Sequence, residues 1–254
     1  MLAATGFTEA VNTVAPAVRK QDWFVLLAMP LAAAAVLLWL ETTDIDRSIA
    51  GWFFDPAAGG FPLRYNAFLE VVLHHWAKYV VVLIACLAIA AFLMSFFIAP
   101  LKPQRRLLLF LALSLALAPA AVSAIKSVSN KHCPWDLEEF GGFVPYTRLL
   151  EPTPPGLKPG HCFPAAHASA GFALMAFYFV GRARRQPLLA WAGLATGVVA
   201  GLVLGFGRML QGAHFLNDTL WAGLVCWVII LMLYLAVIGR SRGTPAALGG
   251  TSMR

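Results

Sequence analysis

The sequence predicts an all-α integral membrane protein with six transmembrane helices in a single domain, residues 1–254. Hydrophobic residues make up 60% of the 254-residue chain and charged residues 12%, and the mean hydropathy is +0.74. Such a composition lies outside the range of soluble domains. Six apolar runs reach or approach the length needed to cross a bilayer. They are Trp23–Leu40, Tyr79–Ile98, Leu107–Ile125, Ala165–Val180, Leu188–Phe206 and Phe215–Ile238.

The runs differ in how strongly they predict a span. The first lacks a small-residue cleavage site, so we interpret it as a retained helix rather than a signal peptide. The fourth is short and contains His167 and Ser169, so hydropathy supports it least. The predicted helices 3 to 6 carry the polar residues discussed below, and we expect them to form the catalytic bundle, with its site at the outer membrane interface.

The charge distribution predicts the orientation in the membrane. The net charge is +7, and cations concentrate in two short turns, LKPQRR (101–106) and GRARRQ (181–186). Short basic loops stay on the cytoplasmic side. We therefore expect a bacterial inner-membrane protein with both termini in the cytoplasm and loops 41–78 and 126–164 in the periplasm. Because the cations sort by topology in this way, the net charge does not indicate nucleic-acid binding.

The segments outside the runs have simpler expected roles. Residues 1–22 are weakly amphipathic and are expected on the inner surface, and residues 240–254 are expected to form a flexible cytoplasmic tail. The aromatic and acidic loop Glu41–Lys78 is expected to lie along the interface and cover the mouth of the bundle. Its adjacent His74 and His75 point to different helix faces, so they do not indicate a metal site.

The stretch RMLQGAHFLND, residues 208–218, places ionisable groups at the mouth of the last span, where such groups are costly and often functional. If the helix already runs from His214, Asp218 lies one turn further on the same face and can hydrogen-bond one ring nitrogen. The other nitrogen is then free to attack. Arg208, in the preceding loop, offers a planar set of donors suited to phosphate. The alternative is that these residues merely mark the membrane interface.

Two further stretches favour the functional interpretation. Lys126 lies at the outer rim of the third span, although a lysine there can simply extend to the headgroups. Pro164 precedes a helix start of small residues, Ala165 and Ala166, followed by His167. Small residues let a ligand approach the backbone, and the first N–H groups of a helix favour an anion. With Arg208, His214 and Asp218 on the same rim, the pattern predicts a phosphate site with a nucleophile and an acid.

The spacing of these residues resembles the three-part signature of the type 2 phosphatidic acid phosphatase superfamily. That superfamily includes bacterial lipid phosphatases and, more distantly, vanadium haloperoxidases, which six spans and a missing arginine disfavour here. The resemblance covers the motifs from residue 126 to residue 218 and the six-span layout. The matching positions are Lys126 with Cys133-Pro134, then Pro164-Ala165-Ala166-His167, then Arg208 with His214 and Asp218.

The resemblance implies a role for each matching residue. His214 would attack phosphorus and form a phosphohistidine, while Asp218 would orient its ring and stabilise the imidazolium. His167 would protonate the leaving oxygen and then activate water. Lys126 and Arg208 would neutralise the non-bridging oxygens. No metal or other cofactor is implied.

Two positions depart from the family pattern. Cys133 stands where the family usually has arginine, and Ala165-Ala166 stands where it usually has Ser-Gly. The second change keeps two backbone N–H donors for the phosphate and loses one hydroxyl. The first removes a bidentate cation, for which three residues lie close enough in sequence to substitute: Lys131, His132 and Arg148.

Cys133 and Cys162 both fall in the predicted outer loop, in an oxidising compartment. A disulfide between them would close a loop of roughly 30 residues and stabilise the fold by about 3.5 kcal/mol in the chain-entropy model. It would also tie the segment after Lys126 to the approach to His167. The alternatives are two free thiols and, less favoured, Cys133 as a second nucleophile.

These observations predict a metal-independent membrane lipid phosphatase with a periplasmic active site. Its substrate would carry a phosphate or diphosphate headgroup: undecaprenyl diphosphate, lipid A or a phosphatidyl lipid. One alternative is a lipid-to-lipid phosphotransferase with the same first half-reaction. Another is a catalytically silent scaffold or transporter that keeps the fold. The expected partners are the bilayer and its lipid substrate, and the oligomeric state stays open.

Overall fold

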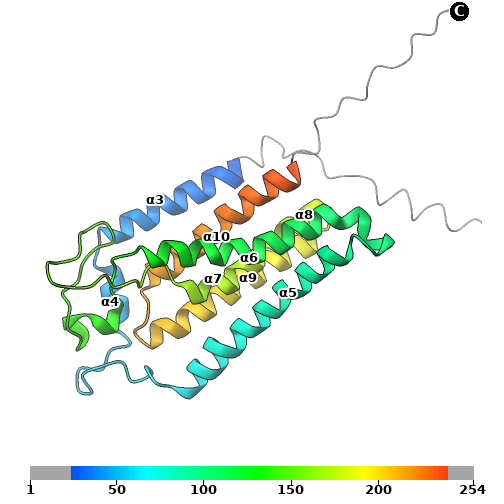
Figure 1. The fold of residues 1–254 in the computed structure, drawn as a ribbon. Coiled ribbons are helices and arrows are strands. Elements are labelled where there is room, and N and C mark those ends of the chain that lie inside the picture. The colour runs from blue at the N-terminus through cyan, green and yellow to red at the C-terminus, as the bar shows by residue number, and fades with distance from the viewer. Residues whose placement is uncertain (1–23, 240–254) are drawn as a thin grey trace, which may run out of the picture.

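A computed structural model describes residues 24–239, and the regular elements within that range are all helical. The long helices pack side by side into an elongated bundle (Figure 1). The predicted inner-surface segment, residues 1–22, and the predicted tail, residues 240–254, lie outside the described residues.

The described chain runs through the bundle in this order. The π-helical η1 (Phe24–Ala28) continues into α3 (Met29–Glu41), and α4 (Ile45–Gly51) follows. Then η2 (Leu69–Trp76) continues into α5 (Ala77–Met94), and η3 (Ala99–Gln104) into α6 (Arg105–Ser127). Two 3-10 turns, η4 (Pro134–Asp136) and η5 (Glu138–Phe140), lie in the next loop. The remaining elements are α7 (Ala166–Phe172), η6 (Ala173–Met175), α8 (Ala176–Ala183), α9 (Pro187–Leu210) and α10 (Leu216–Val237).

Four helical segments of the described chain are long and apolar enough to cross a membrane: Leu69–Met94, Ala99–Ser127, Pro187–Leu210 and Leu216–Val237. A fifth candidate is the pair Leu26–Glu41 and Ile45–Gly51, which is bent by 71°. The six predicted spans are therefore not confirmed. The fourth predicted run instead forms α7, η6 and α8 in succession, with most of its residues buried. Because protein rather than lipid surrounds these short helices, they need no long apolar surface.

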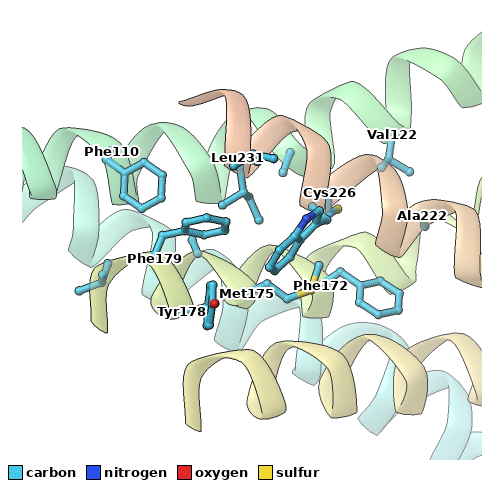
Figure 2. Close-up of a cluster of buried hydrophobic side chains, with 14 of the residues drawn as sticks. Phe110, Val122, Phe172, Met175, Tyr178, Phe179, Ala222, Cys226 and Leu231 are labelled. Carbon is cyan, nitrogen blue, oxygen red and sulfur yellow. The ribbon is translucent and has the colours of Figure 1, made fainter. Parts of the chain in front are cut away.

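Aromatic side chains fill the centre of the bundle, as Figure 2 shows around Phe110, Phe179 and Leu231. The Phe179 ring lies 6.2 Å from that of Phe110 and 4.9 Å from that of Tyr234, centroid to centroid. Lipid tails are as apolar as these side chains, so moving the side chains from lipid into the protein interior gains little free energy. Close packing and ring geometry, worth about 0.5–1.5 kcal/mol per aromatic pair, therefore hold this part of the bundle together.

A row of glycines on α9 sets how closely α7 and α8 approach it. The row repeats every four residues, at Gly193, Gly197, Gly201 and Gly205, so its members share one helix face. On α7, a Cβ added at Gly171 would lie 2.4 Å from the backbone nitrogen of Gly201. The two backbones therefore pack without room for a side chain, as in membrane helix pairs with small residues at the interface.

The polar loops gather at one end of the bundle, on the left in Figure 1. At this end α3, α6 and α9 finish, and α5, α7 and α10 begin. The loops between residues 42 and 165 pack on each other there through a cluster of buried residues, which we call the loop cluster: Ala50, Phe61, Leu137, Phe140, Val144 and Phe215. The first loop thus packs on the second, and together they surround the residues described next.

Candidate active site

Asp218 is buried in the first turn of α10 and caps that helix. Its Oδ2 accepts a hydrogen bond from the backbone N–H of Phe215, at 3.0 Å. The first N–H groups of a helix lack partners within the helix, and a carboxylate there also interacts favourably with the helix dipole. The capping bond turns the carboxylate back over the helix start, towards His214.

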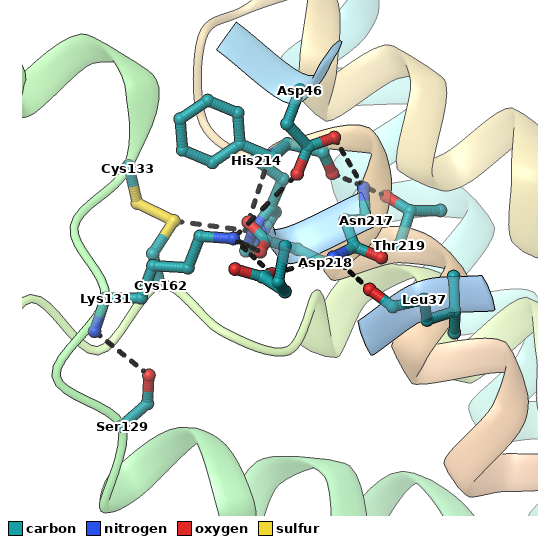
Figure 3. Close-up of polar contacts among 12 residues, drawn as sticks. Leu37, Asp46, Ser129, Lys131, Cys133, Cys162, His214, Asn217, Asp218 and Thr219 are labelled. Atoms are coloured by element: carbon teal, nitrogen blue, oxygen red, sulfur yellow. Dashed lines mark hydrogen bonds and ion pairs between the residues drawn. A yellow bond between two sulfur atoms is a disulfide. The ribbon is translucent and has the colours of Figure 1, made fainter. Parts of the chain in front are cut away.

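His214 lies outside the helix, two residues before its first residue, Leu216. The expectation that His214 and Asp218 share a helical face was therefore wrong. Nδ1 of His214 lies 3.6 Å from Oδ2 of Asp218 (Figure 3), slightly longer than a hydrogen bond. Catalytic hydrogen bonds are often long before substrate binds. Because Nδ1 faces the carboxylate, Nε2 is the ring nitrogen available for attack.

A tight turn brings His214 to the start of α10. Gly212 has a φ of +72°, a conformation that side chains other than glycine disfavour. Its carbonyl accepts a hydrogen bond from the N–H of Trp135 at 2.9 Å, and a Cβ at this position would lie 2.4 Å from the Phe61 ring. The loop cluster therefore holds this turn in place.

Burial lowers the pKa of His214 below its ordinary value of 6.5. The Asp218 carboxylate raises that pKa, and the charges of Lys126 and Arg208 lower it further. The net direction is downward, so the ring stays neutral at ordinary pH. A neutral imidazole keeps the lone pair that a nucleophile needs.

The two predicted phosphate-binding cations lie near the ends of neighbouring helices. Lys126 is in the last turn of α6, and its Nζ donates to the carbonyl of Cys162 at 3.2 Å. Arg208 is in the last turn of α9, so the expectation that it lies in a loop was wrong. Its guanidinium donates to Oε1 of Gln211 at 2.8 Å and pairs with Oε2 of Glu70 at 3.4 Å. Polar and acidic neighbours thus hold this side chain.

The second motif packs directly on the third. Ala165 precedes the first residue of α7, and its N–H donates to the backbone carbonyl of Asp218 at 3.1 Å. The phosphate-binding role expected for this N–H stays a prediction, and in the structure the N–H is used by its bond to Asp218. Any anion at this helix start therefore depends on the N–H groups that follow, beginning with Ala166.

His167 lies one residue further on and lines a cavity of about 280 Å³. The cavity is bounded by α5, α6, α7 and α9, and most of its walls are apolar. The lining residues around His167 are Lys78, Val81, Val82, Ala85, Leu115, Pro119, Ser123, Ala166, Ala170 and Leu204.

The three candidates for the missing arginine have different surroundings. Lys131 is buried at the site, with Nζ 3.2 Å from Oδ1 of Asp218. His132 is buried and lines a separate cavity of about 400 Å³ within the outer loop. Arg148 is partly exposed, and its closest acidic partner is Asp44, at 3.9 Å. Of the three, Lys131 is the one that contacts the third motif, and it does so through the Asp218 carboxylate.

In the structure, Cys133 and Cys162 form a disulfide, with Cα atoms 5.2 Å apart (Figure 3). Sγ of Cys162 lies 3.5 Å from Nδ1 of His214, so the disulfide packs against the ring. One group of potential metal ligands is formed by Cys162, His214 and Asp218, whose ligand atoms lie within 4.8 Å of one another. A sulfur bonded to a second sulfur is not the thiolate that binds metals. The group therefore lacks a good third ligand.

Sequence reasoning missed three polar residues beside the site. Asn217 donates from its side chain to Oε1 of Glu41 at 2.7 Å and from its backbone to Oδ1 of Asp46 at 3.0 Å. The available signal was weak: Glu41 ends an apolar run, and an acid at a membrane helix end is often functional. Asn217 lies 171 residues from Asp46 and 176 from Glu41, so no local sequence pattern indicates these contacts.

Comparison with known proteins decides the family. The PAP2 superfamily model matches residues 107–242, more than half of the chain. This chain belongs to the PAP2 superfamily. The resemblance read from the three motifs is thereby confirmed. The match begins in α6, so α3, α4 and α5 precede the matched PAP2 region.

A curated relative is similar over most of the chain. It is the "Lipid A 4'-phosphatase" of Francisella tularensis subsp. novicida (strain U112), which is 28% identical over 222 residues. The alignment covers 83% of this chain and 96% of the relative, so it also includes helices before the matched PAP2 region. No solved structure matches the chain.

Proposed function

We propose that this protein is a membrane lipid phosphatase that removes a phosphate or diphosphate headgroup on the periplasmic face, through a phosphohistidine. PAP2 membership and the Francisella relative support the phosphatase activity. The single observation that carries the mechanism is the environment of His214: a buried ring whose Nδ1 faces Asp218, with a pKa lowered by burial and by the charges of Lys126 and Arg208.

In the first half-reaction, the lone pair of His214 Nε2 forms a bond to phosphorus. The bond between phosphorus and the lipid oxygen breaks, and His167 supplies the proton that this oxygen takes up. Asp218 stabilises the imidazolium, and the two cations, Lys126 and Arg208, stabilise charge on the non-bridging oxygens.

In the second half-reaction, His167 takes a proton from water as the water oxygen attacks the phosphohistidine. The phosphorus–Nε2 bond breaks, inorganic phosphate leaves, and both histidines return to their starting states. His167 donates the first proton and regains one from water, so the protons balance over the cycle, and the proposed scheme includes no metal.

The cavity beside His167 supports a lipid substrate. Its walls are mostly aliphatic side chains of α5, α6, α7 and α9, and Lys78 is among its lining residues. Apolar walls with a few polar groups are typical of sites that bind ligands with both apolar and charged parts. Among the three lipid classes, the name of the Francisella relative makes lipid A the first substrate to test.

The test is phosphate release by the purified protein in detergent, from lipid A, undecaprenyl diphosphate and phosphatidic acid, each with and without EDTA. We expect release from at least one lipid, unchanged by EDTA and absent in His214→Ala. Transfer of phosphate to a second lipid without free phosphate would instead support a phosphotransferase. Loss of release with EDTA would overturn metal independence. No turnover of any lipid would support a silent scaffold.

A further inference from the structure

Lys131 is a buried cation surrounded by carboxylates. It is 1% exposed, and its Nζ lies 2.9 Å from Oε1 of Glu41, 3.2 Å from Oδ1 of Asp218 and 3.8 Å from Oδ2 of Asp46. A buried ammonium is costly unless partners compensate for its lost hydration. The three acids supply that compensation, and their side chains are at most 11% exposed.

The acids around Lys131 come from distant parts of the chain. Glu41 ends α3, Asp46 is in α4, and both precede the matched PAP2 region. Asn217, next to Asp218, joins them by donating to Glu41 and to Asp46 (Figure 3). Helices α3 and α4 therefore reach the catalytic carboxylate through Lys131 and Asn217.

Lys131 keeps its charge in this environment. Burial would lower the pKa of its ammonium, but the carboxylates of Asp218, Glu41 and Asp46 raise it, and the net direction is upward. The ring centroid of Phe215 lies 5.0 Å from Nζ and that of Phe163 5.9 Å from it. These rings add favourable contacts with the cation and shield the ion pairs from water.

We propose that Lys131 is a positioning residue that holds Asp218 in the ionised state and orientation needed by His214. The ammonium binds Oδ1, which leaves Oδ2 for the Phe215 N–H and for the His214 ring. Glu41 and Asp46 in turn fix the ammonium. Lys131 thus acts through the carboxylate and does not substitute for the phosphate-binding arginine. This inference rests on the proposed function.

The proposal predicts opposite pH shifts for two variants. The charges facing the His214–Asp218 pair are Lys131 from the outer loop, Lys126 from α6, Arg208 from α9, Glu41 from α3 and Asp46 from α4. Removing a cation raises the pKa of the His214–Asp218 pair, because the protonated pair is then less repelled. The acid limb of kcat/KM therefore moves to higher pH. Removing Glu41's negative charge moves that limb to lower pH.

The experiment compares Lys131→Met, Lys131→Arg and Glu41→Gln with wild type, using the best lipid substrate. We expect Lys131→Met to lower kcat by about 10²-fold, with KM changed less than about 3-fold, because orientation of the catalytic ring is lost. The acid limb of kcat/KM should move to higher pH by about one unit in Lys131→Met and to lower pH in Glu41→Gln. Lys131→Arg should recover part of kcat. Lys158→Met, an exposed lysine in the same loop, is the matched control and should behave as wild type.

A phosphate-binding role for Lys131 would instead raise KM, and a purely structural role would leave both pH profiles unchanged; either result overturns the proposal. Folding is checked by size-exclusion chromatography. If Lys131→Met aggregates, the double variant Lys131→Met/Glu41→Gln replaces it, because it removes one positive and one negative charge together. An inactive wild type would refute the proposed function alone. Nitrogen NMR of the His214 ring then tests the positioning role without turnover, and His214→Gln assigns the signal. The pKa of His214 must be higher in Lys131→Met than in wild type.

Discussion

A single carboxylate links local folding to chemistry. Oδ2 of Asp218 accepts the Phe215 N–H at the start of α10 and faces the His214 ring. Oδ1 pairs with Lys131. The position of the carboxylate therefore depends on the helix end rather than on free rotation of a surface side chain. Preorganised groups of this kind stabilise charge without rearranging during the reaction.

Removing either member of the catalytic pair should have a graded effect. We expect His214→Ala to lower kcat by about 10³-fold or more, because the variant loses the nitrogen that is proposed to attack phosphorus. Asp218→Asn should be severe but smaller, since the nucleophile remains and loses its orientation. Phosphate release by protein of wild-type monodispersity measures both. Lys158→Met, on the exposed surface of the outer loop, is the control. Most of the activity surviving in His214→Ala would contradict the phosphohistidine.

The lowered pKa of His214 predicts the pH profile. The attacking ring must be neutral, and it is neutral above its pKa. Because burial moves this pKa below 6.5, the acid limb of kcat/KM should fall below that pH. Asp218 raises the His214 pKa, so Asp218→Asn should shift the limb lower still, together with the loss in rate. A limb above pH 6.5 in wild type would contradict a buried neutral histidine.

Sequence spacing predicted which residues to examine but not how they meet. The pairing of His214 with Asp218 follows from their four-residue separation, although the contact arises from helix capping instead of a shared helix face. The contact between Lys131 and Glu41 spans 90 residues and has no local pattern. Such contacts depend on how helices pack, and that packing is not encoded in any short stretch.

At the scale of elements, the disulfide joins the loop after α6 to the approach to α7. Cys133 and Cys162 are 29 residues apart, so linking them should stabilise the fold by about 3.5 kcal/mol in the chain-entropy model. Cys133→Ser and Cys162→Ser should therefore lower the thermal midpoint by similar amounts, and the double variant by little more. Thermal unfolding in detergent measures this. Mass spectrometry of unreduced, alkylated protein provides the control, and two alkylated thiols would disprove the link.

The backbone contact between α7 and α9 makes a second prediction at this scale. Gly171→Ala would place a Cβ 2.4 Å from the Gly201 nitrogen, and a backbone atom cannot rotate away. The helices must separate, and we expect a loss of about 1–3 kcal/mol, seen as a lower thermal midpoint. Gly60→Ala is the matched control, because nothing lies within 4 Å of its added Cβ. Equal midpoints for the two variants would show that the helices do not pack this closely.

At the scale of the whole molecule, hydropathy predicted the all-helical membrane class, whereas the six spans that it predicted are not confirmed. The run from Ala165 to Val180 is apolar, yet α7 and α8 are largely enclosed by protein. An apolar stretch does not reveal whether lipid or other helices surround it. The four candidate spans within residues 24–239, or five with the bent pair, could therefore be identified only from the structure. The gathering of the motifs at one end, by contrast, follows from helices that alternate in direction.

The distribution of charge between the two ends of the bundle predicts the orientation. The turns at the end opposite the site carry Lys102, Arg105, Arg106 and the cations of residues 182–185, and such short basic turns stay in the cytoplasm. We expect alkaline phosphatase fused to the C-terminus to be inactive and a fluorescent reporter there to be bright. Alkaline phosphatase inserted at Gly156, an exposed position in the loop at the site's end, should be active and serves as the control. The reverse pattern would place the site in the cytoplasm and exclude periplasmic headgroups as substrates.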